Sequence, residues 1–168
     1  MKRNVPAFQA PSPTPEAPIA VKTGYRILLW GVPLLAGVYF LIGMSPPLLS
    51  RYGQPEAEAV LNLYNHFCHQ IPERSFVIGG TPLSLCSRCT GFYGGLFWGS
   101  LTVARSGGGR SLGLRISALL VAPALIDFWF DLSSLVWGSN MLRCLSGLLA
   151  AIGVVRFGFP RLLWAARR

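Results

Sequence analysis

The residues best suited to chemistry in this sequence are cysteines and histidines that lie close together along the chain. Cys68 and His69 are adjacent, and two residues separate Cys86 from Cys89. Two cysteines at that spacing can chelate one ion or close a small redox disulfide, because the intervening turn brings both sulfurs to one side. Together with Cys68 and His69, they have the number and chemistry of a tetrahedral zinc site.

Three interpretations of these residues stay open. In the first, Cys68, His69, Cys86 and Cys89 form a zinc site; because adjacent residues seldom bind one ion, Cys68 or His69 then supports the site from outside and one position is open. In the second, Cys86 and Cys89 are a dithiol that passes electrons. In the third, one of them forms a structural disulfide with Cys68. Covalent haem is disfavoured, because Thr90 rather than histidine follows Cys89.

Acidic residues inside an apolar stretch form a second group of candidates. Asp127 and Asp131 are four residues apart and share one helical face. Ionisable side chains in a membrane span cost about 2.5–3.5 kcal/mol on insertion scales, so they indicate function or a fixed ion pair. We expect Arg143 to pair with Asp131. With no base at its depth in the next span, Asp127 is expected to be protonated or hydrogen-bonded to Ser117 or Ser146.

The composition around these residues indicates that lipid is the solvent. The 168 residues are 52% hydrophobic and 12% charged with a mean hydropathy of +0.47, which is too apolar for a soluble domain. A helix needs about 20 residues to cross the hydrocarbon. We therefore predict an all-α integral membrane protein with four transmembrane helices, at about 27–44, 89–104, 116–137 and 141–159. The second span is short, but its glycines suit close helix packing, with Gly147 and Ala151 as a matching surface.

Basic residues predict the orientation of these spans. Lysine and arginine dominate the N-terminal flank, the segment between the second and third spans, and the C-terminus, whereas acids balance the bases of the outer loop, 45–88. We expect a multi-pass protein of the plasma or inner membrane with both termini in the cytoplasm. Residues 1–24 are rich in proline and are expected to be a disordered cytoplasmic tail before a transmembrane domain at 25–168. The net charge of +9 is not taken as nucleic-acid binding, because no recognition motif accompanies it.

The outer loop is expected to contain an amphipathic helix over residues 55–71, opened by Pro55 and ended by Pro72. One helical face, expected to lie against the bundle, collects Val60, Leu63, Tyr64, Phe67 and Ile71. Cys68 lies at the edge of this face, whereas His66 is about 160° from Cys68 and is expected to be a surface histidine. Cys144 begins the last span and is expected to be a packing residue, although it could face the other thiols.

Part of the chain resembles a known family. The strings Phe67-Cys68-His69-Gln70, Pro72-Glu73-Arg74-Ser75-Phe76 and Leu85-Cys86-Ser87-Arg88-Cys89-Thr90-Gly91-Phe92-Tyr93-Gly94 carry the resemblance. They resemble a family of uncharacterised predicted membrane proteins of bacteria and archaea, a domain of unknown function. Asp127 and the segment 140–143 look like a second motif of that family, which the chain departs from at Cys144. The resemblance implies a polytopic membrane protein and supplies no activity.

Three functions are compatible with these observations. The first is metal binding, with zinc held by Cys68, His69, Cys86 and Cys89. The second is a membrane thiol oxidoreductase, similar to the bacterial disulfide-bond oxidase and to vitamin K epoxide reductase, which pass electrons to a quinone. The third is an intramembrane hydrolase or transporter that uses Asp127, Asp131 and Arg143. The lipid bilayer is the one partner that the sequence indicates, and protein partners and oligomeric state stay open.

Overall fold

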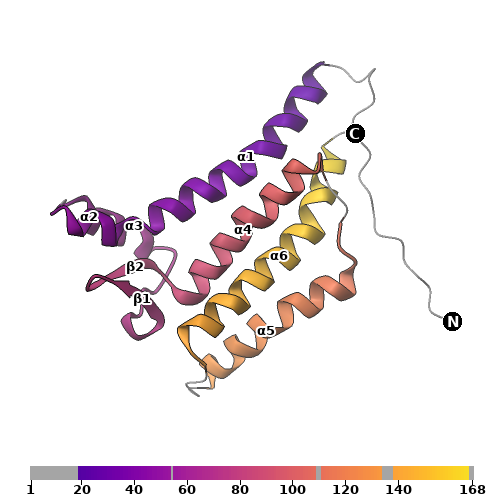
Figure 1. Cartoon of the computed structure of the whole chain (residues 1–168). Coiled ribbons are helices and arrows are strands. Elements are labelled where there is room, and N and C mark those ends of the chain that lie inside the picture. The colour runs from indigo at the N-terminus through magenta and orange to yellow at the C-terminus, as the bar shows by residue number, and fades with distance from the viewer. Residues whose placement is uncertain (1–18, 54, 109–110, 134–137, 167–168) are drawn as a thin grey trace.

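A computed structural model describes residues 19–53, 55–108, 111–133 and 138–166 and is mostly helical (Figure 1). The four long helices are α1 (Ile19–Gly43), α4 (Ser87–Arg105), α5 (Leu114–Leu132) and α6 (Asn140–Ala165). Between α1 and α4 lie two short helices, α2 (Pro46–Arg51) and α3 (Glu56–Asn65), and a 3₁₀ turn, η1 (Pro72–Arg74). An antiparallel hairpin of β1 (Ser75–Ile78) and β2 (Thr81–Cys86) completes the connection.

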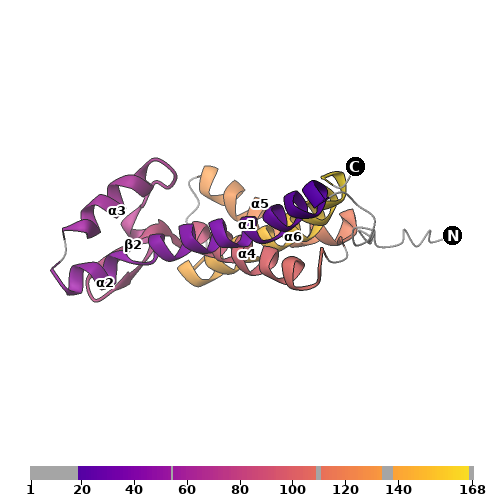
Figure 2. The same ribbon diagram turned by 90° about the horizontal axis from the view of Figure 1, so that it is seen from above.

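The long helices lie side by side in the order α1, α4, α6, α5 (Figure 1). Helix α4 packs against both α1 and α6, and α5 packs along α6. The short helices and the hairpin gather at one end of this layer, as the turned view also shows (Figure 2). We call this the thiol end, because Cys68, Cys86 and Cys89 lie there. The opposite end, with the first residues of α1 and the last of α6, is the basic end.

Small residues allow α4 and α6 to approach closely. A Cβ atom added to Gly91 would lie 1.8 Å from the carbonyl oxygen of Cys144, and one added to Gly147 would lie 2.2 Å from the carbonyl oxygen of Arg88. Gly95 faces Ala151 in the same way, at 2.7 Å. The predicted match between the glycines of the second span and the small surface of the last is therefore confirmed.

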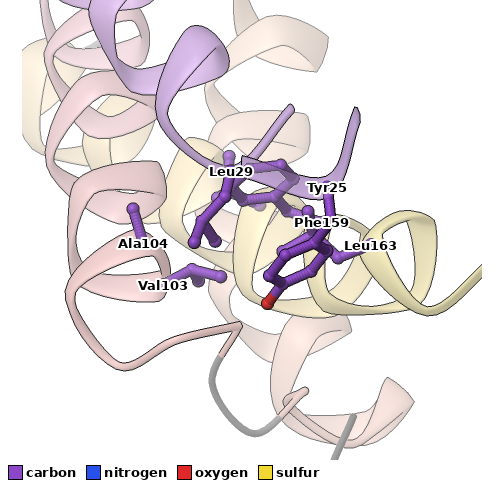
Figure 3. Packing of buried hydrophobic residues seen from close by; sticks show 7 residues of the cluster. Tyr25, Leu29, Val103, Ala104, Phe159 and Leu163 are labelled. Atoms are coloured by element: carbon purple, nitrogen blue, oxygen red, sulfur yellow. The ribbon is translucent and has the colours of Figure 1, made fainter. Parts of the chain in front are cut away.

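The basic end is closed by side-chain packing (Figure 3). Tyr25 and Leu29 of α1, Val103 and Ala104 of α4, and Val155, Phe159 and Leu163 of α6 form one buried cluster. The Tyr25 hydroxyl donates a hydrogen bond of 2.8 Å to the carbonyl oxygen of Gly107, just beyond the end of α4. This bond ties the first turns of α1 to the segment that follows α4.

Within the described residues, two helical stretches are long and apolar enough to cross a membrane, Thr23–Arg51 and Asn140–Ala165. The four predicted spans are thus supported by length and composition only for the first and the last. Helix α4 has arginines near both ends and several glycines, and α5 carries Arg115, Asp127 and Asp131. Helix α1 begins at Ile19, inside the segment expected to be a tail. Helix α5 ends at Leu132, before the predicted 137, and residues 134–137 lie outside the described ranges, as do residues 1–18 of the expected tail.

The connection between α1 and α4 differs most from the prediction. The hairpin is a departure from an all-α fold; its turn, Gly79-Gly80, has φ angles of 59° and 82°, which glycine adopts readily. The predicted helix over 55–71 is wrong beyond Asn65, where α3 ends. Gln70 has a left-handed φ of 48°, and its amide donates to the carbonyl oxygen of Leu61, which holds the chain in a turn. Tyr64 is buried as predicted, whereas Leu63 and Phe67 are exposed.

Candidate functional site

Three thiols meet at the junction of α3, β2 and α4. Cys68 follows α3, Cys86 is the last residue of β2, and Cys89 lies in the first turn of α4. Their sulfur atoms all lie within 4.8 Å of one another. We call these residues the thiol cluster. The strand runs into the helix without a loop, so the spacing of Cys86 and Cys89 spans the start of α4 and brings both sulfurs to one side.

An aromatic base supports the thiol cluster from the bundle side. The ring centroid of Tyr39, on α1, lies 4.7 Å from that of Tyr64 and 4.5 Å from that of Tyr93. Tyr64 also donates its hydroxyl hydrogen to the carbonyl oxygen of Tyr39. Cys68 is buried in the same cluster as Tyr64 and Leu85. Since each ring comes from a different helix, the sulfurs are held by tertiary packing rather than by one loop.

Hydrogen bonds to Cys68 favour its thiolate. The Cys86 and Cys89 thiols and the backbone amide of Cys86 lower the pKa of Cys68 well below its ordinary value. The amide nitrogen of Cys86 lies 3.1 Å from the Cys68 sulfur. The same sharing raises the pKa of Cys86, which acts as the donor. A thiolate is the form of cysteine that binds metals and attacks disulfides, so the cluster is suited to either reaction.

The other candidates near the thiols lie apart from this group. His69 is exposed and borders the cavity beside the cluster, but the group of ligand atoms within 4.8 Å consists of the three sulfurs. His66 is exposed, as expected, with Nδ1 3.3 Å from the carbonyl oxygen of Asn62. Cys144 is half-buried against Gly91 and is not among the three grouped thiols. Its expected role in packing agrees with this contact.

A network of ion pairs lies beside the thiol cluster, and we call it the ion-pair network. Its members are Arg74, Arg88, Asp127, Asp131 and Arg143. Asp131 accepts from all three arginines, at 3.2 Å from Arg74, 2.6 Å from Arg88 and 3.1 Å from Arg143. The predicted pair of Asp131 with Arg143 is therefore present.

The expected surroundings of Asp127 are corrected. Its partner is Arg88, whose Nε donates to Oδ2 at 2.7 Å, rather than a serine. Arg143 Nε also lies 3.9 Å from Asp127 Oδ1, so the last span does have a base at this depth. Asp127 lies only five residues before the end of α5 at Leu132, which places it near the start of α4. Arg88 lies between Cys86 and Cys89, so the start of α4 carries the thiols and the ion-pair partner together. The position of Arg88 between two candidate cysteines indicated a role at the site, but the sequence did not indicate that Asp127 is its partner.

Asn140 fixes the start of α6 to the thiol end. Its side-chain nitrogen donates to the carbonyl oxygens of Glu73 and Ser75, at 3.3 Å and 3.2 Å. Its side-chain oxygen accepts from the Ser87 hydroxyl at 3.4 Å. One amide thus joins α6 to the turn before β1 and to the first residue of α4. This contact helps to hold Arg143, one turn further along α6, next to Asp131.

The thiol cluster and the ion-pair network share one cavity of about 160 Å³. All three cysteines line it, together with His69 and every member of the network except Asp127. Soft sulfur ligands and guanidinium groups therefore face the same small space. The site can hold a metal ion or exchange thiols on one side and can contact a charged ligand on the other.

Comparisons with known proteins give a family and no activity. Residues 68–157 match the model of a family described as Predicted membrane protein (DUF2085). An uncharacterised protein of Methanothermobacter thermautotrophicus is 35% identical over 95 residues, which are 54% of this chain and 83% of that protein. An uncharacterised protein of Methanocaldococcus jannaschii is 29% identical over 101 residues, 58% of this chain and 65% of that protein. No solved structure matches the chain.

Proposed function

The chain belongs to the DUF2085 family of predicted membrane proteins, and on that premise we propose that it is a multi-pass membrane protein with a zinc site at its thiol end. Cys68, Cys86 and Cys89 are the ligands, and His69 is close enough to the cavity to contribute or to orient a fourth ligand. The observation that carries this proposal is the meeting of three sulfurs within 4.8 Å. Zinc–sulfur bonds of about 2.3 Å set the sulfurs of a tetrahedral site about 3.8 Å apart.

The chemistry of the thiol cluster favours a soft divalent metal. Thiolates select zinc over magnesium and calcium, which prefer oxygen ligands. The burial of Cys68 and the amide hydrogen bond to its sulfur are typical of the outer groups that orient and stabilise a thiolate ligand. Three protein ligands leave one position for water or another molecule, which is the pattern of catalytic rather than structural zinc sites.

Four membrane spans with both termini in the cytoplasm are the second part of the proposal. Helix α4 packs between α1 and α6, the two helices apolar enough to cross a membrane, and so lies at their depth. Helix α5 lies along α6 and presents Leu119, Leu125 and Trp129 outward, with exposed fractions of 74%, 62% and 67%. Such a surface is unfavourable in water and suited to lipid. The bases of the basic end then lie in the cytoplasm, and the thiol end lies outside.

Metal and thiol analysis of the purified protein tests the zinc site. We expect about one zinc ion per chain in the wild type and in Cys144→Ser, which alters a nearby thiol outside the cluster. The double variant Cys86→Ser/Cys89→Ser is expected to lose the metal while keeping its elution volume in detergent. Metal-free protein with reduced, reactive cysteines, after purification without chelators, would contradict the proposal.

A thiol oxidoreductase is the second candidate, because Cys86 and Cys89 flank the start of a helix with a third thiol in reach. Its outcome in the same experiment is metal-free protein with a Cys86–Cys89 disulfide under non-reducing conditions. A Cys89→Ser variant would then trap a mixed disulfide with a partner, and a quinone would be the expected electron acceptor.

Labelling of intact cells tests the orientation. In a background without native cysteines, Glu58→Cys on α3 is expected to react with an impermeant maleimide. Ser106→Cys, after α4, is expected to react only when the membrane is opened. Both side chains are exposed, so reactivity reports the side of the membrane. The opposite pattern would reverse the proposed orientation, and labelling of both in intact cells would contradict the four spans.

A further inference from the structure

At the thiol end, the arginines carry more positive charge than the two carboxylates neutralise. Three guanidinium groups and two carboxylates give the ion-pair network a formal charge of +1. Asp127 does not line the cavity, whereas all three arginines do. The face that the network turns toward the cavity is therefore richer in donors than the network as a whole.

Two of the arginines retain N–H groups that can bind a ligand. Arg88 uses Nε and Nη2 on Asp127 and Asp131, and Arg74 uses Nη1 on Asp131. A guanidinium has five N–H donors in a planar fork. Among the described residues, Arg88 Nη1 and Arg74 Nη2 have no carboxylate partner. The two side chains are 25% and 33% exposed, so a ligand in the cavity can reach them.

The size of the cavity limits what can bind. A volume of about 160 Å³ corresponds to about five water molecules at roughly 30 Å³ each. A carboxylate or a phosphate group fits this space, whereas a nucleotide or a folded peptide segment does not. Both groups present coplanar or clustered oxygens that a guanidinium fork binds through two hydrogen bonds.

We propose that this cavity binds a small oxyanion, a carboxylate or phosphate group, between Arg74 and Arg88 on one side and the thiol cluster on the other. The inference rests on the proposed function for its second contact, because a zinc ion with three protein ligands offers an open position to an oxygen of the anion. Zinc with three thiolates has a formal charge of −1, which the network balances, so the attraction comes from the local donors rather than from net charge.

Titration of the whole protein in neutral detergent with inorganic phosphate, followed by calorimetry, tests the inference. We expect saturable binding in the wild type, at least tenfold weaker binding in Arg74→Gln, and unchanged binding in Arg51→Gln, an exposed arginine of α2. Asp131→Asn is expected to strengthen binding severalfold, because it removes a competing negative charge. A loss of structure alone would weaken binding in both Arg74→Gln and Asp131→Asn, so the opposite signs identify the charge effect.

Two further arms identify the source of the oxyanion. Binding of short-chain phosphatidic acid but not of inorganic phosphate would assign the site to a lipid headgroup, and binding of both would indicate a soluble anion. Equal binding of dioctanoylglycerol, which has no phosphate, would overturn the inference. So would the absence of binding by either anion, or an unchanged affinity in Arg74→Gln. Zinc content measured on the same samples reports the proposed function separately.

Discussion

The two ends of the helical layer are held together by different interactions. At the basic end, seven apolar side chains from α1, α4 and α6 pack into one cluster, closed by a tyrosine hydroxyl (Figure 3). At the thiol end, α4, α5, α6 and the connection before α4 surround a cavity that three thiols and four charged residues line. Apolar packing therefore stabilises the basic end, whereas ion pairs around a cavity hold the helices together at the thiol end.

Breaking the ion-pair network is expected to have the largest effect on the free energy of unfolding. Arg88→Leu removes the arginine that lies nearest to both Asp127 and Asp131. Breaking a buried ion pair typically costs about 3–5 kcal/mol in the free energy of unfolding. Arg105→Leu, at the exposed end of the same helix, is the matched control and is expected to change it by less than about 0.5 kcal/mol. Unfolding in detergent measures both variants. Equal stabilities would mean that the charges at the thiol end do not hold the helices.

Packing at the basic end gives the next largest effect. Leu29→Ala removes a buried side chain and is expected to lower the free energy of unfolding by about 2 kcal/mol, through the cavity it leaves. Zinc content is expected to stay at the wild-type value, because the thiol cluster lies at the other end of the layer. Loss of zinc in this variant at a temperature where it is folded would show that the two ends are coupled.

The close approach of α4 and α6 at their glycines is expected to contribute less to stability than either of these features. Gly91→Ala would put a Cβ 1.8 Å from the carbonyl oxygen of Cys144, whereas at Gly99 the nearest atom, on Val155, is 3.5 Å away. We expect a cost of about 1–2 kcal/mol for Gly91→Ala and little change for Gly99→Ala. The backbones therefore approach most closely at the thiol end. Similar melting temperatures for the two variants would contradict that geometry.

The hydroxyl of Tyr25 is expected to have the smallest effect. Tyr25→Phe removes the hydrogen bond to Gly107 but leaves the ring in the cluster, at a cost of about 0.5–1 kcal/mol. Tyr52→Phe, on an exposed side chain, is the control. A thermal shift in detergent is sensitive enough to separate them. A loss of stability as large as that expected for Leu29→Ala would mean that this hydrogen bond, and not apolar packing, is the main stabilising interaction at the basic end.

Sequence patterns were sufficient to predict the membrane class, the positions of the four long helices to within several residues, and the grouping of Cys68 with Cys86 and Cys89. Apolar runs and glycine spacing are local patterns, and the family match agrees with them. The pairing of Asp131 with Arg143 was also predictable from the sequence, because both residues fall at neighbouring ends of consecutive helices. The Gly79-Gly80 pair was a readable signal for the hairpin that the helical prediction passed over.

Which charged residues face the thiols depends on how the helices pack against one another. Arg74 and Arg88 lie 57 and 43 residues before Asp131, and nothing local to either arginine indicates that partner.

 The small residues of α4 and α6 let the two backbones approach closely. This approach brings Arg88, at the start of α4, within reach of Asp131 on α5. The same approach decided that Asp127 pairs with Arg88 and that thiols and guanidinium groups share one cavity. A sequence specifies each helix through nearby residues, but the contacts between helices depend on depth and rotation, which only the packed structure fixes.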